Sequence, residues 1–342
     1  MNIMSLAEIL DRSLDILRKY IKSIVMFSLG YGIIMFIILI PVIFIFVFVT
    51  LFAYSGNVLS DTEPSFVPIA MLFLISVPLI LGISLSYYIG LIKISSQDIL
   101  KEKVLAYDAI KASFKSFFKV LGVGAVATVL SLPLLAVFGV ILYFIIKSID
   151  NNVSFPEFSY NPLESLPGFG AEIIMPIIII LLATLLLVFI ISVYMNYFSF
   201  SLHALTLEKL GVIGSIKRSF KLVKGSFWRV FGCTMLFYFT IYAITTSFQS
   251  FILVLSGLVY LLMQFLNIPQ DTLTFIFLAY NYTSYPVSIL SGLVISPVWV
   301  IMSTLLYYNR RFTLEGYDMT LKLEEIRKNT NMKASITSET DL

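Results

Sequence analysis

Charged and reactive side chains are scarce in this sequence of 342 residues. Only 13% of the residues are charged and 59% are hydrophobic, and the chain has one cysteine and one histidine. A soluble domain carries about 25% charged residues. The shortage of charge therefore excludes an ordinary soluble protein and indicates a chain that lies in a membrane. The mean hydropathy of +0.96 agrees with this interpretation.

The single cysteine and the single histidine limit the sites that the chain can form. Cys233 has no second cysteine with which to form an intrachain disulfide, and we interpret it as a packing residue in an apolar run. His203 has no Cys, Asp or Glu beside it at metal-ligand spacing, so it predicts no metal site. We interpret His203 as a polar residue near the membrane surface. The alternative is a pH-sensitive contact or a contact to lipid phosphate.

Motifs for chemistry are absent from the sequence as well. It contains no glycine-rich phosphate loop, no Ser-His-Asp arrangement and no paired carboxylates at useful positions. We therefore predict no catalytic residues, no cofactor and no metal, and expect that the protein is not an enzyme. A membrane-embedded hydrolase is the least favoured class, because residues for acid–base or metal chemistry are missing.

Six uncharged stretches are long enough to cross a bilayer, whose hydrocarbon core of about 30 Å requires about 20 helical residues. The stretches are Ile24–Tyr54, Phe66–Ile92, Val120–Ile146, Ile173–Leu207, Val230–Phe265 and Tyr285–Tyr308. The fifth could instead be two short spans broken near residues 247–250. Ion-coupled carriers normally keep charged residues inside their spans, and these stretches contain no Asp, Glu, Lys or Arg, so a coupled transporter is disfavoured.

Basic residues are concentrated in alternate connections between these stretches. Of the 23 lysine and arginine residues, all but Lys147 precede the first stretch, follow the sixth, or lie between the second and third or the fourth and fifth. Cytoplasmic loops carry such an excess, so both termini are predicted in the cytoplasm and the chain in the cell membrane. Splitting the fifth stretch would place the basic tail outside. We therefore predict six spans in a membrane domain, residues 1–312, and a polar cytoplasmic tail, residues 313–342.

An amphipathic stretch precedes the first, third and fifth spans, with apolar residues at helical spacing and charges opposite. The three can be overlaid on Ser13, Ser113 and Ser219, each followed by an apolar and then a charged residue. We predict an all-α fold of three repeats, each an amphipathic helix and two spans, over about residues 5–95, 105–207 and 211–308.

These amphipathic stretches predict contact with the membrane surface, and their cations suit anionic lipid headgroups. The alternative is a packed cytoplasmic collar in which the stretches contact one another. The basic residues that we expect at the interface are Arg18, Lys19, Lys111, Lys115, Lys217, Arg218, Lys221, Lys224 and Arg229.

Three segments carry a resemblance to a known family. They are the opening Leu6–Leu14 (LAEILDRSL), the stretch Ser215–Val230 (SIKRSFKLVKGSFWRV) and the close Leu305–Arg311 (LLYYNRR) with Glu315–Asp318 (EGYD). Together they resemble the glycerophosphoryl diester phosphodiesterase membrane-domain family and related bacterial polytopic membrane proteins, over essentially the whole membrane region. In that family the membrane domain occurs fused to a soluble phosphodiesterase or apart from it, and its own role is not established.

The resemblance implies no activity for this chain. The soluble enzymes of that family use histidine and carboxylates around a divalent metal, whereas His203 is the one histidine here. We expect a non-catalytic accessory or assembly component of the bacterial envelope, beside a membrane partner such as a transporter and without nucleic acid. The alternative is a carrier or transporter subunit for a lipid-like or apolar substrate. Asn196, Gln249 and Gln264 are expected to hydrogen-bond across helices, or else to line a polar pathway.

Overall fold

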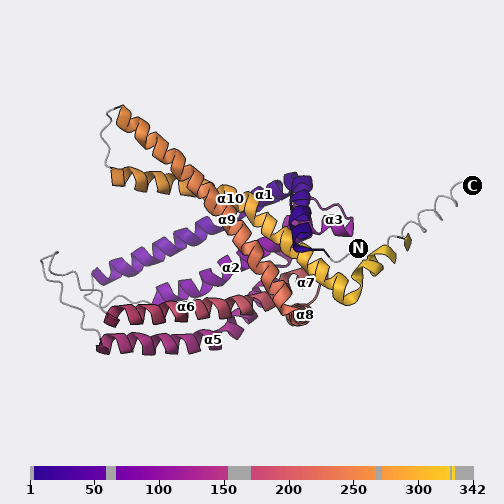
Figure 1. Ribbon diagram of the computed structural model, residues 1–342, viewed down its shortest axis with the longest axis horizontal. Helices are drawn as coiled ribbons and strands as arrows, with labels where there is room; N and C mark the ends of the chain where they lie inside the picture. The colour runs from indigo at the N-terminus through magenta and orange to yellow at the C-terminus, as the bar shows by residue number, and fades with distance from the viewer. Residues whose placement is uncertain (1–3, 59–66, 153–170, 267–271, 324–325, 328–342) are drawn as a thin grey trace, which may run out of the picture.

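The structure is a computed structural model that describes residues 4–58, 67–152, 171–266, 272–323 and 326–327. Within these ranges the chain is helical and contains no strand (Figure 1). The elements are α1 (Leu6–Val58), α2 (Val67–Ser95), α3 (Gln97–Leu100), α4 (Ala106–Lys115), α5 (Phe117–Asn152), α6 (Ala171–Phe198), α7 (Ser201–Leu207), α8 (Val212–Lys224), α9 (Phe227–Phe265) and α10 (Thr272–Glu315).

Several of these helices are long and apolar enough to cross a membrane. Among the described residues, five segments meet this condition: Ala7–Leu51, Ser76–Leu100, Phe117–Val140, Ile178–Leu207 and Phe227–Phe265. The described part of the chain is therefore all-helical and compatible with a multi-pass membrane protein. The sixth predicted stretch lies inside α10, a helix of 44 residues. Residues 59–66, 153–170 and 267–271, which lie in or beside the connections between predicted spans, fall outside the described residues, as do residues 324–325 and 328–342 of the tail.

Helix boundaries agree with the prediction in one case and differ in others. The fifth stretch forms a single helix, α9, with no break near residues 247–250. The fourth stretch is divided, because α6 ends at Phe198 and α7 begins at Ser201. The first amphipathic stretch is continuous with its span in α1, whereas Ser116 separates α4 from α5.

The turn between α6 and α7 is held by a serine from another helix. Ser219 of α8 donates a hydrogen bond to the carbonyl of Tyr197 at 2.6 Å and accepts one from the N–H of Phe200 at 3.2 Å. A helix end leaves such backbone groups without partners, and burying them unsatisfied is costly. Ser219 thus compensates for the break that hydropathy alone did not predict.

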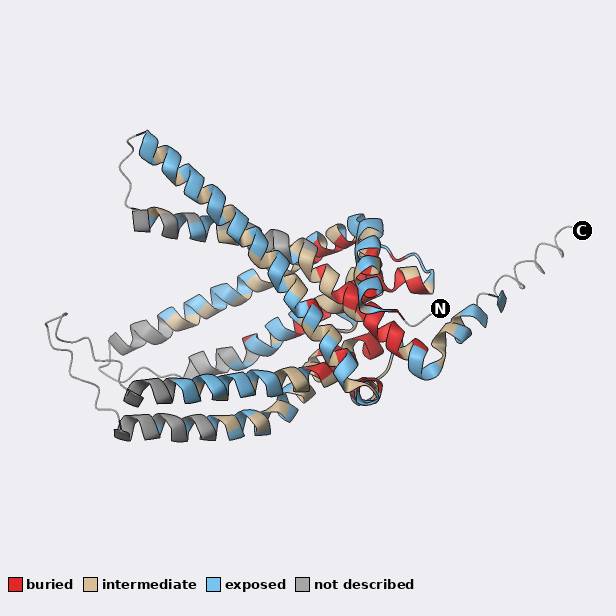
Figure 2. Cartoon of the chain, in the orientation of Figure 1, coloured by how far each residue is buried: buried red, intermediate tan, exposed pale blue. Residues whose placement is uncertain are grey.

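The two ends of the long helices differ in burial. Buried residues gather where α3, α4, α7 and α8 lie, a region that we call the packed end (Figure 2). Away from it the helices diverge, and their large apolar side chains are exposed. We call residues 33–51 of α1, 129–143 of α5, 178–190 of α6 and 236–265 of α9 the apolar arms. In α1, Phe44, Ile45, Val47 and Phe48 are all exposed, so this part of the helix contacts no protein on several sides.

Close helix contact shapes the packed end. Gly90 of α2 allows Phe27 and Ser113 to approach, because an added Cβ would lie 2.2 Å from the Phe27 ring and 2.7 Å from the Ser113 hydroxyl oxygen. Phe27 also stacks on Tyr87 with ring centroids 5.5 Å apart. The core therefore depends on one small residue next to large aromatic ones.

Left-handed residues end several helical segments at this end. Among the described residues φ is positive at Lys101 (54°), Lys209 (54°) and Gly316 (60°), after α3, α7 and α10 respectively. Such a residue is a common way to stop a helix. After Gly316 the chain is helical again over residues 317–323, and Tyr317 stacks on Phe312 at 6.3 Å. The start of the predicted tail therefore packs against the helices.

Candidate functional site

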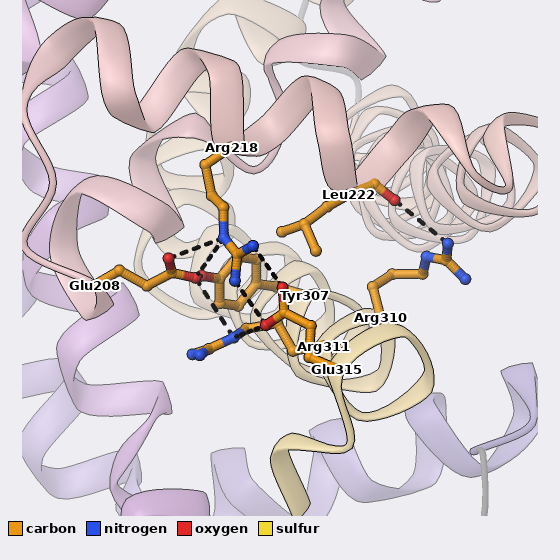
Figure 3. Close-up of polar contacts among 7 residues, drawn as sticks. All are labelled: Glu208, Arg218, Leu222, Tyr307, Arg310, Arg311 and Glu315. Atoms are coloured by element: carbon orange, nitrogen blue, oxygen red, sulfur yellow. Dashed lines mark hydrogen bonds and ion pairs between the residues drawn. The ribbon is translucent and has the colours of Figure 1, made fainter.

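A cluster of ion pairs joins α7, α8 and α10 at the packed end (Figure 3). Arg218 of α8 lies at its centre, with its Nε 2.9 Å from Glu208 and its Nη1 2.5 Å from Glu315. Arg311 contacts the same two carboxylates at 3.4 and 3.3 Å. Tyr307 donates its hydroxyl to Glu208 at 2.5 Å. We call these five residues the arginine cluster.

Local sequence explains how the cluster forms. Glu208 ends α7 directly before the left-handed Lys209, which turns the chain into α8. Arg311 and Glu315 are four residues apart on α10 and therefore share one helix face. Two arginines meet two carboxylates, so the charges within the cluster balance.

Electrostatics favour the charged forms of Arg218 and Glu315. Burial alone would lower the pKa of Arg218, but hydrogen bonds to Glu315 and Glu208 raise that pKa well above its ordinary value. The hydrogen bond from Arg218 is the main cause that holds the pKa of Glu315 below its ordinary value. The ion pairs therefore hold α8 to the ends of α7 and α10.

A chain of buried hydroxyl and imidazole groups lies beside the cluster. Ser95 of α2 donates to the Thr304 hydroxyl of α10 at 2.9 Å, and Nε2 of His203 in α7 lies 3.2 Å from the same oxygen. His203 also stacks on Tyr307, with ring centroids 5.4 Å apart. His203 is thus buried between helices rather than exposed at the surface.

This histidine has no partner set for catalysis in the structure. Among the described residues its Nε2 contacts the Thr304 hydroxyl, and no carboxylate orients the ring. Within the same ranges no group of three or more His, Cys, Asp or Glu side chains could hold a metal ion. The arrangement can tie α2, α7 and α10 together through hydrogen bonds.

The polar residues predicted inside spans are placed differently from one another. Asn196 accepts a hydrogen bond from Thr234 at 3.3 Å, which links α6 to α9 and agrees with the expected cross-helix bond. Gln249 is half-buried and Gln264 is exposed, both on α9.

The predicted interfacial cations lie on the outer faces of α1, α4 and the α8–α9 segment. All except Arg218 are exposed: Arg18, Lys19, Lys111, Lys115, Lys217, Lys221, Lys224 and Arg229. Lys19 pairs with Asp98 at 2.6 Å. Arg218 instead turns inward to the arginine cluster. The structure thus brings one of the nine predicted residues into the partly buried arginine cluster and leaves the others at the surface.

The amphipathic helices have two different faces. On α8 the buried face contains Ser215, Ser219 and Leu222, which pack toward the other helices. Its opposite face exposes Ile213 and Phe220 beside the lysines. The inner face packs mainly against α5, α6 and α7, whereas the collar alternative expected the amphipathic stretches to contact one another. The outer face keeps the apolar and basic side chains that suit a membrane surface.

The arginine cluster was missed by sequence reasoning, although a signal was present. The tripeptide Thr-Leu-Glu occurs at residues 206–208 and again at 313–315, and both glutamates belong to the cluster. A repeated tripeptide at the ends of two predicted spans would have indicated equivalent positions near each other.

Comparisons with known proteins add no relative. No protein family model, no curated protein and no solved structure matches the chain. Function is therefore argued from the residues and their geometry.

Proposed function

We propose that this protein is a non-catalytic accessory or assembly component of the bacterial cell membrane, where it presents apolar helices to a membrane protein partner such as a transporter. The observation that carries the proposal is the contrast between a closed packed end and apolar arms that protein does not cover. In the most apolar windows of α1, α6 and α9, none of the residues is buried. Apolar surface of this extent requires lipid or other transmembrane helices around it.

Six spans with both termini in the cytoplasm form part of the proposal. Three features support it: α10 contains the sixth apolar stretch, the basic connections belong to elements at the packed end, and Met4 hydrogen-bonds Asn309 at 3.2 Å. The contact between Met4 and Asn309 brings the start of α1 next to the end of α10. An even number of spans would place these two ends on the same side of the membrane, in agreement with this contact.

Three repeated units are also proposed. In support, Ser13, Ser113 and Ser219 are each fully buried, at 0% exposure, on the helix that opens each proposed unit. The left-handed residues Lys101 and Lys209 follow the first two units at a similar place. Equivalent burial and equivalent turns are what an internal repeat produces.

The resemblance to the phosphodiesterase membrane-domain family is kept as a further proposal, and it brings no activity with it. The surface cations of α4 and α8 support contact with anionic headgroups, because they lie beside exposed aromatic side chains such as Tyr107 and Phe220. The packed end would then lie at the cytoplasmic surface of the bilayer.

Photocrosslinking in native membranes tests the accessory function. A photoreactive amino acid replaces Phe251, which is 62% exposed on α9, and in a control variant replaces the buried Phe237 of the same helix. The Phe251 variant should give one discrete adduct with another membrane protein, and the Phe237 variant should crosslink only within the chain. Lipid adducts alone at position 251 would contradict the proposal.

A lipid-transfer assay tests the carrier alternative separately. Purified protein is placed in vesicles that contain a fluorescent phospholipid, and a membrane-impermeant quencher reports movement between leaflets. We expect the rate of empty vesicles. A rate that rises with the amount of protein would favour a carrier of lipid-like substrates over an accessory component.

A further inference from the structure

The junction of α8, α9 and α10 contains a buried cation that no carboxylate balances within the described part of the chain. Arg310 is 5% exposed. Figure 3 shows its side chain directed away from Glu208 and Glu315 and toward Leu222, whose carbonyl accepts a hydrogen bond from Nη2 at 3.3 Å. The adjacent Arg311 pairs with both of those carboxylates. The Nε of Arg310 has no hydrogen-bond partner among the described residues.

A second unpaired polar group lies at the same junction. The side-chain oxygen of Ser226 is buried and has no hydrogen-bond partner in the described chain. Ser226 directly precedes α9, where a serine ordinarily caps the first turn, yet it makes no side-chain cap bond. The Arg310 guanidinium lies close to the backbone just before Ser226, because its Nη2 is 3.8 Å from the position that a Cβ on Gly225 would take. Gly225 is the residue before Ser226.

The surroundings favour a negative charge at this place. The first turn of α9 presents backbone N–H groups and the positive end of the helix dipole. Arg229 belongs to that turn. Burial is the main cause that lowers the pKa of Arg310, and the charge of Arg229 lowers it further.

Capping of α8 accounts for only part of this geometry. A cap explains why Arg310 donates to the carbonyl of Leu222, near the end of α8. It leaves the Nε of Arg310 and the hydroxyl of Ser226 unexplained, since both are buried without partners. Buried polar groups are nearly always hydrogen-bonded, so a ligand that accepts from both would complete the site.

We propose that Arg310, Ser226 and the first turn of α9 bind a phosphate-type oxyanion, either the headgroup phosphate of a lipid or a soluble phosphate. A guanidinium matches phosphate oxygens with parallel N–H groups, and a helix N-terminus supplies further donors. Trp228, two residues beyond Ser226, is 73% exposed and suits the membrane interface, within reach of headgroups. The inference rests on the packed end alone and does not depend on the accessory function.

Tryptophan fluorescence of the full chain tests the site. The chain has two tryptophans, so W299F leaves Trp228 as the reporter. The protein is placed in phosphatidylcholine nanodiscs and titrated with inorganic phosphate at constant ionic strength; in a second arm, the nanodiscs contain rising fractions of phosphatidylglycerol. A saturable change with phosphate indicates a soluble oxyanion. A change that saturates at a low fraction of phosphatidylglycerol indicates a headgroup, and either result supports the site.

Substitutions on the W299F background separate the site from general charge attraction. R310Q should weaken binding about tenfold or more, and S226A several-fold, because each removes donors to the oxyanion. K103Q is the matched control, since it also removes one cation but from an exposed position before α4 that is not among the predicted interfacial cations, and its affinity should match that of the parent chain. If R310Q and K103Q bind alike, or if neither phosphate nor phosphatidylglycerol gives a saturable change in the parent chain, the site is refuted and Arg310 only caps α8.

A stability measurement keeps the test valid if R310Q does not fold. S226A removes one hydroxyl and should fold. A ligand that binds only the native state raises the melting temperature with its concentration. The ligand found in the titration should therefore raise the melting temperature of the parent chain more than that of S226A. Equal rises in both proteins would exclude Ser226 from the site and contradict the proposal.

Discussion

Phe27 and Phe44 lie on the same helix, α1, and have opposite surroundings. Phe27 is fully buried at the packed end, where it contacts Tyr31 and Tyr87, whereas Phe44 is 72% exposed in an apolar arm. Composition does not distinguish the two regions, since both are apolar. The difference is in their neighbours: protein surrounds the first phenylalanine, and the second requires lipid or a partner helix. One helix therefore passes from a protein core into a second apolar environment.

Polar residues divide in the same way. The packed end buries Ser13, Asn309, His203 and Arg310. Backbone and side-chain partners there satisfy most of the polar atoms, as buried groups require. The arms lack charged side chains, and several of their hydroxyl groups bond to their own helix, as Thr240 does to the Leu236 carbonyl and Thr245 to the Ile241 carbonyl. The contacts between helices at the packed end thus determine the fold, and the arms expose apolar surface to lipid or a partner helix.

The largest effect is expected from truncating matched phenylalanines. Phe27→Ala should lower the free energy of unfolding by about 3–5 kcal/mol, because it removes a buried ring and leaves a cavity. Phe44→Ala should change it by less than about 0.5 kcal/mol, since its ring contacts no core. Chemical unfolding in the same detergent measures both. Equal losses would mean that the arms also pack against protein.

Reversing charges on the outer face of α8 should have the next largest effect. A peptide of residues 211–229 should bind anionic vesicles and become helical there, with roughly 1 kcal/mol contributed by each cation near the surface. Replacing Lys217, Lys221 and Lys224 by Glu should therefore weaken binding by about 3 kcal/mol or more. Vesicle co-sedimentation at several salt concentrations measures this, because the attraction is screened beyond about 8 Å at physiological salt.

The control for that peptide changes the other face. Replacing Ser215 and Ser219 by Ala should leave binding nearly unchanged, since these serines face the protein in the intact chain. A native-sequence peptide that stays unbound on anionic vesicles at low salt would restrict α8 to the collar role.

Close packing of α2 predicts a smaller loss. Gly90→Ala should destabilise the protein by about 1–3 kcal/mol, because the new methyl group would overlap Phe27 and Ser113. In α5, Gly139 has open space around it. Gly139→Ala should therefore be neutral or stabilising by up to about 1 kcal/mol through helix propensity. Melting temperatures of the two variants should move in different directions, and a shared loss would contradict the distinction between the regions.

Acid should loosen the packed end by the smallest amount. The pKa of Glu315 is lower when folded than when unfolded, mainly because of its hydrogen bond from Arg218. Its contribution is present above the unfolded value of about 4.3 and is lost as the pH falls through the lower folded value. For a partly exposed pair we expect about 1 kcal/mol or less. Unfolding midpoints measured from pH 6 to 3 should fall more for the native chain than for Glu315→Gln; parallel curves would exclude this ion pair as a cause.

Hydropathy and charge predicted the helical class and the long segments well, because backbone satisfaction in lipid leaves little choice of structure. The single helix α9 followed from charge placement, and the buried serines at 13, 113 and 219 had been selected by sequence overlay. The break at Ser199 was not predictable, since it depends on Ser219 of a distant helix.

For the arginine cluster, the repeated Thr-Leu-Glu marked the two glutamates, but the sequence did not show which cation they would meet. Arg218 resembles the other cations of its amphipathic helix, and only tertiary packing places Glu208 and Glu315 beside it. Sequence also does not distinguish Arg310 from Arg311. Arg311 pairs with two carboxylates, whereas Arg310 has no carboxylate partner among the described residues. Pairing between distant helices decides such cases, and a charge pattern along one helix does not contain that information.

Reporter topology tests the central claim most directly, namely that the packed end faces the cytoplasm and that the chain crosses the bilayer six times. A reporter that is active only outside the cytoplasm is fused after Glu164 in one strain and after Lys322 in another. The first fusion should give signal and the second none, because the connections rich in lysine and arginine belong inside. Signal from the fusion after Lys322 would contradict the six-span account.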